Sequence, residues 1–179
     1  MNQQNIKLPD FLLADMYKSS LVEIESKIMD KPIANENAKD KPGILENIKL
    51  LGKNSKNVIV VTNYSEVAFL PDNELLFLTN ILKACNLNLS DIGIANYATH
   101  KIHYNLMKEK LGAKKIILFG LKASDVQLPF TVPDFQVQQY DECSILQAPA
   151  LGAMNEDTAS GKNLKMKLWI ALKQMFGIQ

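Results

Sequence analysis

Arginine is absent from this chain of 179 residues: its 20 basic residues are all lysines, and they stand against 19 acidic residues. The chain therefore lacks the planar, bidentate side chain with which proteins read guanine edges and clamp phosphates. The formal net charge of +1 creates no overall field that would draw the chain to nucleic acid or to a membrane. Any contact with a polyanion must therefore be local.

Cysteine and long apolar runs are also scarce. The two cysteines, Cys85 and Cys143, lie in apolar stretches, as is typical of reduced thiols. No apolar run is long enough to span a bilayer, and no stretch reads as a signal peptide. We therefore expect a cytoplasmic protein that makes no contact with membranes.

Glycine-rich turns are missing where a nucleotide-binding site would need them. The apolar run Val58–Val61 is followed by Thr62-Asn63-Tyr64-Ser65-Glu66, which matches neither a P-loop nor a dinucleotide fingerprint. The two histidines, His100 and His103, can share a helix face, but no Cys, Asp or Glu accompanies them at ligand spacing. We expect neither a cofactor nor a metal.

Three segments of different character follow one another along the chain. Residues 1–29 contain an amphipathic helix, predicted from about Leu8 to Met29 by apolar side chains at helical spacing. Residues 30–56 are rich in Lys, Asn, Asp and Glu and predict a polar linker. In residues 57–179, apolar runs alternate with helical stretches, which predicts a domain.

This alternation predicts an α/β fold, a three-layer α/β/α domain whose central sheet is mostly parallel and has four strands. Functional residues are expected beyond the carboxyl ends of the strands, which share one edge of such a sheet. The expected strands are 58–61, 91–97, 116–120 and 144–146, and the expected helices are 72–84, 99–111, 123–128 and 162–176.

The last predicted helix carries a local basic surface. Lys162, Lys165 and Lys167 lie there without an acidic residue among them, and they are a weak candidate for contact with DNA. Cations near the carboxyl end of a helix also simply stabilise it. Trp169, the only tryptophan, is expected to pack in the core rather than to stack on a base.

Two binding sites are open to the predicted N-terminal helix. Its apolar stripe can fold back onto the domain, or it can dock into the groove of a partner protein. The pattern of residues does not separate these alternatives.

Four stretches around the predicted strand ends resemble the motifs of the uracil-DNA glycosylase superfamily in their order and spacing, over roughly residues 57–176. They read VIVVTNYSE, LLFLTNILKACNLNLSDIGIANYATHK, AKKIILFGLKAS and SILQAPAL. The resemblance implies the fold of that superfamily and a cleft at the strand ends. The residues that would form this cleft are Thr62, Asn63, Tyr64, Asn96, Gly120, Ala148 and Pro149.

The chemistry of the superfamily depends on side chains that differ here. Active members carry a water-positioning acidic or amide residue in a glycine-containing loop after the first strand, and a histidine in the last motif that stabilises the leaving uracil anion. This chain has Thr62-Asn63-Tyr64 and Ala148 at those places. An alanine side chain cannot donate a hydrogen bond to an anion, and two cysteines cannot hold the four-cysteine cluster of some members. We expect a degenerate cleft with no catalytic residues.

One non-enzymatic branch, the psi subunit of bacterial DNA polymerase III, is similar in its carboxyl-terminal pattern. The matching residues are Ala148-Pro149-Ala150-Leu151 and Leu168-Trp169. This resemblance implies an accessory role in DNA replication, with clamp-loader or other replication proteins as partners. Amphipathicity assigns the docking to Phe11, Leu12, Leu13, Tyr17 and Leu21. The alternatives are a divergent DNA glycosylase that acts on a flipped, damaged base and a stand-alone nucleic-acid-binding module.

Overall fold

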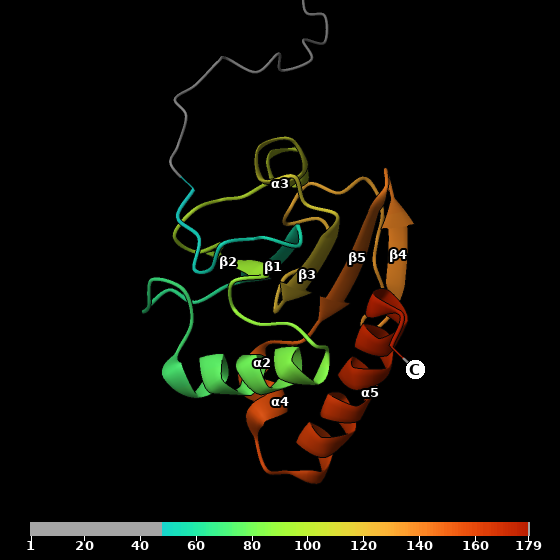
Figure 1. The fold of residues 1–179 in the computed structure, drawn as a ribbon. Coiled ribbons are helices and arrows are strands. Elements are labelled where there is room, and N and C mark those ends of the chain that lie inside the picture. The colour runs from blue at the N-terminus through green and yellow to red at the C-terminus, as the bar shows by residue number, and fades with distance from the viewer. Residues whose placement is uncertain (1–47, 179) are drawn as a thin grey trace, which may run out of the picture. The chain divides into compact units, whose positions relative to one another are not determined.

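The computed structural model describes residues 48–178, which are built around a five-stranded sheet in the order β2-β1-β3-β5-β4 (Figure 1). Four strands are parallel, and β4 runs antiparallel to β5. The predicted α/β class with a mostly parallel sheet is therefore confirmed, whereas the predicted number of four strands is wrong. The strands are β1 (Val58–Thr62), β2 (Ile92–Asn96), β3 (Lys115–Phe119), β4 (Val137–Tyr140) and β5 (Cys143–Ala148).

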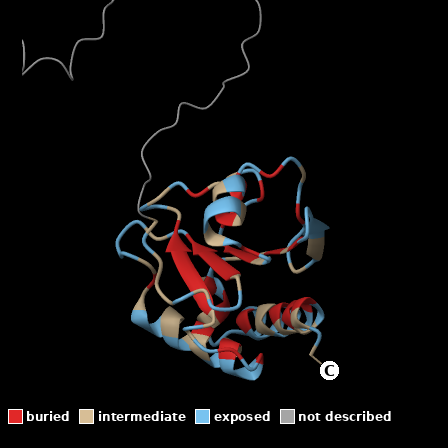
Figure 2. Cartoon of the chain, turned by 45° about the horizontal axis from the view of Figure 1, so that its top comes forward, coloured by how far each residue is buried: buried red, intermediate tan, exposed pale blue. Residues whose placement is uncertain are grey.

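The parallel strands form from apolar runs because both faces of the sheet are covered. All residues of β1 are buried, and so are all residues of β2. Side chains alternate between the faces: Val58 and Val60 join one core cluster, whereas Ile59 and Val61 join the other. Figure 2 shows these buried strands between the surrounding helices.

Helices cover both faces of the sheet. On the face of Val58 and Val60 lie α2 (Asp72–Ala84), α4 (Leu151–Asn155) and α5 (Ala159–Phe176). On the opposite face, α3 (Tyr104–Leu111) packs together with apolar residues of the segment 121–132. The two cores are therefore built from different parts of the chain.

The helices α2, α3 and α5 follow the sequence predictions, with differences at the starts of α3 and α5, whereas α4 was not predicted. The bounds of α2 are those predicted, and α3 ends as expected at Gly112, whose φ is +62°. However, α3 begins at Tyr104 rather than at Thr99, because the chain first turns after β2 through a hydrogen bond from His100 N to Asn96 O of 3.0 Å.

Two further segments differ from the prediction. The helix α5 begins at Ala159 rather than at Lys162, because the Thr158 side chain accepts a hydrogen bond from Gly161 N and caps the first turn. The predicted helix 123–128 is a series of turns instead. Its first turn is held by a hydrogen bond of 2.7 Å from Lys122 N to Asp125 Oδ2.

The antiparallel strand β4 was not predicted, because neither the strand nor its turn carries a strong sequence signal. The strand reads Val-Gln-Gln-Tyr and is only half-buried or exposed. Its turn to β5 consists of Asp141 and Glu142, whose φ angles are 47° and 63°. Hairpin turns of this conformation usually carry Asn-Gly, so the dipeptide Asp-Glu does not indicate a hairpin.

Residues 48–56, the described part of the predicted linker, run beside strand β2. Leu51 N donates to Ile94 O at 2.9 Å, and Ile94 N donates to Leu51 O at 2.8 Å. Gly52 follows with a φ of +103°, and a Cβ atom there would lie 2.2 Å from Ile92 O. This segment therefore covers the backbone groups that the outer strand would otherwise leave unpaired.

The predicted amphipathic helix of residues 1–29 lies outside the described residues, as do residues 30–47 of the predicted linker. The docking residues Phe11, Leu12, Leu13, Tyr17 and Leu21 are therefore outside them too. Within residues 48–178, no helix combines the length and the apolar character that crossing a membrane requires.

Candidate functional site

The parallel strands bring the predicted cleft residues to one edge of the sheet. Thr62 is the register partner of Asn96 at the ends of β1 and β2, and Phe119 is the partner of Ala148 at the ends of β3 and β5. The remaining predicted residues, Asn63, Tyr64, Gly120 and Pro149, directly follow these strands.

Asn96 is buried at this edge, and its side-chain amide makes four hydrogen bonds. Its Oδ1 atom accepts from Tyr64 N at 3.0 Å and from Ala98 N at 3.2 Å. Its Nδ2 atom donates to Tyr64 O at 2.7 Å and to Val67 O at 2.8 Å. Since an asparagine side chain offers two donors and two acceptor sites, the fold uses its whole capacity. Asn96 thus holds the loop after β1 in place.

Thr62 has a related structural task. Its hydroxyl is buried and donates to Phe69 O at 2.9 Å, so it fixes the far end of the same loop. The Thr62 and Asn96 side chains together account for the path of residues 63–69 between β1 and α2.

The part of the edge formed by β3 and β5 is closely packed. Gly120 has a φ of +68°, and a Cβ atom there would lie 3.2 Å from Ala150 Cβ. Gly120 N also donates to Ala148 O at 2.9 Å. Ala148 is 2% exposed, so its side chain serves the core and is not presented to a ligand. Pro149 follows it and is half-buried.

Tyr64 and Glu74 are joined by a hydrogen bond at the border of this edge, in which the phenol donates to Glu74 Oε2. Burial raises the pKa of the Tyr64 phenol above its ordinary value, and the neighbouring Glu74 carboxylate raises it further. Glu74 also lies beside α4, because a Cβ atom at Gly152 would be 3.0 Å from its Oε1 atom. This contact was not predictable from the sequence, since Glu74 belongs to no motif.

The hydrogen bond between Tyr64 and Glu74 should stabilise the fold by an amount that depends on pH. We expect Tyr64→Phe to lower the free energy of unfolding by about 1 kcal/mol at pH 7, because one hydrogen bond is lost while the ring is kept. The folded-state pKa of Tyr64 is raised, so its contribution is complete below the ordinary tyrosine pKa of about 10 and declines as the pH rises above it. Urea unfolding of both proteins at about pH 7 and pH 10.5 should show a smaller difference at the higher pH; a larger one would contradict this assignment.

An open hollow of about 190 Å³ lies beside the loop. Asn63 and Glu66 are exposed there and can hydrogen-bond a polar ligand. Both groups remain in contact with solvent, whereas stabilisation of a reaction's charge relies on donors held in a water-excluded site. The residues that line the hollow are Asn63, Tyr64, Ser65, Glu66, Val67 and Pro71.

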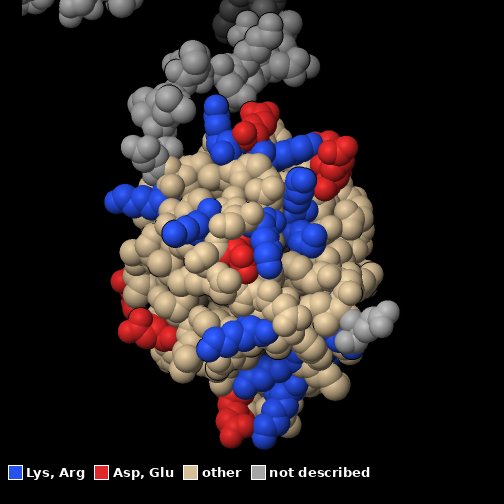
Figure 3. Space-filling view, viewed as in Figure 1, with Lys and Arg blue, Asp and Glu red and all other residues tan. Residues whose placement is uncertain are grey.

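The lysines predicted to contact DNA lie on α5. Figure 3 shows lysine side chains gathered at the lower end of the molecule, where the first turns of α5 lie in Figure 1. Lys162 pairs with Asp157 at 3.1 Å, and Lys165 Nζ lies 5.4 Å from the centroid of the Phe77 ring. Lys167 is turned about 200° around the helix from Lys165. The three lysines therefore do not form one continuous stripe.

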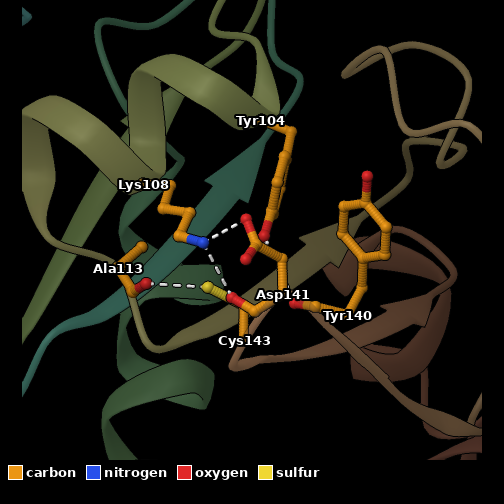
Figure 4. A network of polar contacts seen from close by, with 6 residues as sticks. All are labelled: Tyr104, Lys108, Ala113, Tyr140, Asp141 and Cys143. Carbon is orange, nitrogen blue, oxygen red and sulfur yellow. Dashed lines mark hydrogen bonds and ion pairs between the residues drawn. The ribbon is translucent and has the colours of Figure 1, made fainter.

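A polar network at the other end of the strands was not predicted. Lys108 of α3 forms an ion pair with Asp141 in the β4–β5 turn and donates to Asp141 O at 2.9 Å (Figure 4). The Tyr104 hydroxyl donates to Tyr140 O at 3.3 Å, and the buried Cys143 thiol donates to the carbonyl of Ala113 at 2.9 Å. The hydrogen bond with Asp141 raises the pKa of Lys108. These contacts fasten the hairpin to α3 and to Ala113, which follows the end of that helix.

The histidines considered as metal ligands have other surroundings. His103 precedes the first turn of α3, and its Nδ1 atom is buried without a hydrogen-bond partner. Within residues 48–178, no three His, Cys, Asp or Glu side chains are grouped closely enough to hold a metal ion.

No protein-family model fits the chain, and no curated protein matches it significantly.

Proposed function

We propose that this protein is a non-catalytic accessory subunit of the replicative DNA polymerase clamp loader, with a glycosylase-like domain similar to the psi subunit, and that it acts by tethering proteins to one another. The observation that most supports a non-catalytic role is the hydrogen bonding of Asn96, whose four polar positions are all occupied by the backbone of residues 64–98. An amide used in this way positions a loop and has no capacity left for a substrate.

Ala148 supports the same proposal. It stands where the resemblance places a catalytic histidine, and it is buried against the core. Removal of one preorganised donor to a developing anion typically slows an enzyme by about 100- to 1000-fold. In this proposal, the domain has kept the fold but lacks the group that would stabilise the leaving base.

Tethering would be the task of the predicted N-terminal helix. Burial of its Phe, Leu and Tyr side chains in the groove of a partner contributes about 1.5–3 kcal/mol for each side chain before the costs of ordering. A helix bound in this way raises the local concentration of whatever the domain holds.

A pull-down with purified clamp-loader subunits tests the proposal. The full-length protein should retain these subunits, and a variant with Tyr17→Asp and Leu21→Asp should lose most of the recovery, because two charges then stand on the apolar stripe. Ser19→Asp with Ser26→Asp is the matched control, since it adds the same charges on the opposite side of the predicted helix. Equal recovery of the stripe variant and the control would rule out tethering by this helix.

The exposed Asn63 beside the hollow favours a second candidate, the divergent DNA glycosylase. Incubation with duplexes that contain uracil or hypoxanthine tests it directly. Release of free base by the full-length protein, abolished by Asn63→Ala, would replace the accessory-subunit proposal. Steeply salt-dependent binding to DNA without any protein partner would instead favour a nucleic-acid-binding module.

A further inference from the structure

An apolar groove of about 80 Å³ lies between α2 and α5 on the outside of the domain. In Figure 1 these two helices lie on the same side of the sheet and diverge from each other. Trp169 is only half-buried there, so the prediction that it packs in the core holds for part of its ring. The residues that line the groove are Phe77, Ile81, Lys165, Leu168, Trp169 and Leu172.

Next to the groove, α5 exposes large apolar side chains that the domain core does not use. Met166 is 58% exposed and Ile170 is 60% exposed. Met166 precedes Trp169 by three positions and Ile170 by four, so the Met166 side chain neighbours each of them on the helix surface. The opposite side of α5 supplies the core with Leu168, Ala171, Leu172 and Met175. The exposed strip therefore enlarges the apolar surface of the groove.

The same side of α5 is positively charged. Lys162, Lys165 and Lys173 lie within about 80° of one another around the helix. In the described part of the chain, the ion pairs are Lys56–Asp91, Lys108–Asp141 and Lys162–Asp157, so Lys165 and Lys173 have no carboxylate partner there. An occupant of the groove would meet apolar side chains bordered by ammonium groups.

We propose that this groove binds an amphipathic helix of a partner protein, whose apolar side packs on Trp169 and Met166 and whose acidic flank faces Lys165 and Lys173. Helices that recognise grooves do so through apolar side chains at helical spacing, and acidic residues beside them would complement the lysines. Nucleic acid fits less well, because Met166 and Ile170 are aliphatic and bases stack on aromatic rings. This inference does not depend on the clamp-loader assignment.

Trp169 is the only tryptophan of the chain and makes the test direct. The probe is a synthetic peptide of about 18 residues with leucines at helical spacing, glutamates on the other side and no tryptophan. Titration into the full-length protein should change the fluorescence of Trp169 in a saturable way. A scrambled peptide, and a peptide with lysines in place of the glutamates, should bind at least about 10-fold more weakly.

Paired variants locate the binding. Met166→Asp should weaken binding by about 10-fold or more, whereas Leu76→Asp should not. Leu76 is a matched control because it is 63% exposed on α2 and lies about 100° around that helix from Phe77. Lys165→Glu should likewise weaken binding, and Lys167→Glu, which changes the charge on the other side of α5, should not. Thermal unfolding shows whether each variant is folded.

Several results would overturn the proposal. Equal binding of the acidic, basic and scrambled peptides would show that the groove has no preference for an acidic helix. Binding of single-stranded DNA instead of the peptide would assign the surface to nucleic acid. Self-association that Met166→Asp abolishes would make the occupant a second copy. Peptide binding only to a chain that begins at Leu45, the start of the compact unit Leu45–Gln179, would show that the natural occupant of the groove is the N-terminal segment. None of these results bears on the outcome of the pull-down with the Tyr17→Asp and Leu21→Asp variant, so the two proposals are tested independently.

Discussion

Gly52→Ala is expected to lower the free energy of unfolding by about 2–4 kcal/mol. A Cβ atom at this position would lie 2.2 Å from Ile92 O and 2.5 Å from Leu89 O, and the φ of +103° is one that side-chain-bearing residues rarely adopt. Both contacts are with backbone, and Ile92 belongs to the sheet, so β2 cannot move aside. The segment that contains Leu51 must move instead, which breaks its two hydrogen bonds with Ile94.

Chemical denaturation measures this loss, and Gly177→Ala separates the clash from the backbone strain. Gly177 also has a positive φ, +64°, but a Cβ atom there would have no neighbour within 4 Å. Gly177→Ala should lower the free energy of unfolding by only about 1 kcal/mol. The amide proton of Ile94 should also exchange faster in Gly52→Ala, because its acceptor has moved away. If the two glycine substitutions cost the same, the close approach at Gly52 does not limit stability.

Asn96→Leu should lower the free energy of unfolding by at least about 3 kcal/mol. Leucine has a similar size but no polar atoms, so the N–H and C=O groups of Tyr64 and the C=O of Val67 would lose their partners. The loop after β1 would then no longer be held, and the Tyr64 amide should lose its protection against hydrogen exchange.

Asn63→Ala is the control for this experiment, because Asn63 is exposed and should change stability by no more than about 0.5 kcal/mol. Urea unfolding of the two variants gives the comparison. A near-normal stability of Asn96→Leu would show that the amide does not hold the loop. If that variant also lost a base-releasing activity, Asn96 would belong to a catalytic site.

The central sheet was predictable because its parallel strands are covered on both faces. Burial on both sides requires continuous apolar runs such as Val58–Val61, which few other structures need. The strand β4 was not predictable in this way, since it lies at the edge of the sheet and half of its residues face solvent. Its turn is held by the contact between Lys108 and Asp141, which joins residues far apart in the sequence.

The candidate site was predictable in its position but not in the roles of its residues. Parallel topology alone places Thr62, Asn96 and Ala148 at one edge, and the sequence marks the ends of these strands. Whether an amide is available to a ligand depends on its hydrogen-bond partners, and those of Asn96 come from a loop with no recognisable pattern. The pairing of Tyr64 with Glu74 depends in the same way on how α2 packs against the sheet.

The antiparallel bridge between Leu51 and Ile94 decides how the protein should be shortened in experiments. A fragment that begins at Asn57 would keep every strand of the sheet, yet it would leave the outer backbone of β2 open to strands from neighbouring molecules, a common route to aggregation. Loss of partner binding by such a fragment would then reflect insoluble protein as much as a missing docking segment. Deletions that end before Ile48 avoid this confusion.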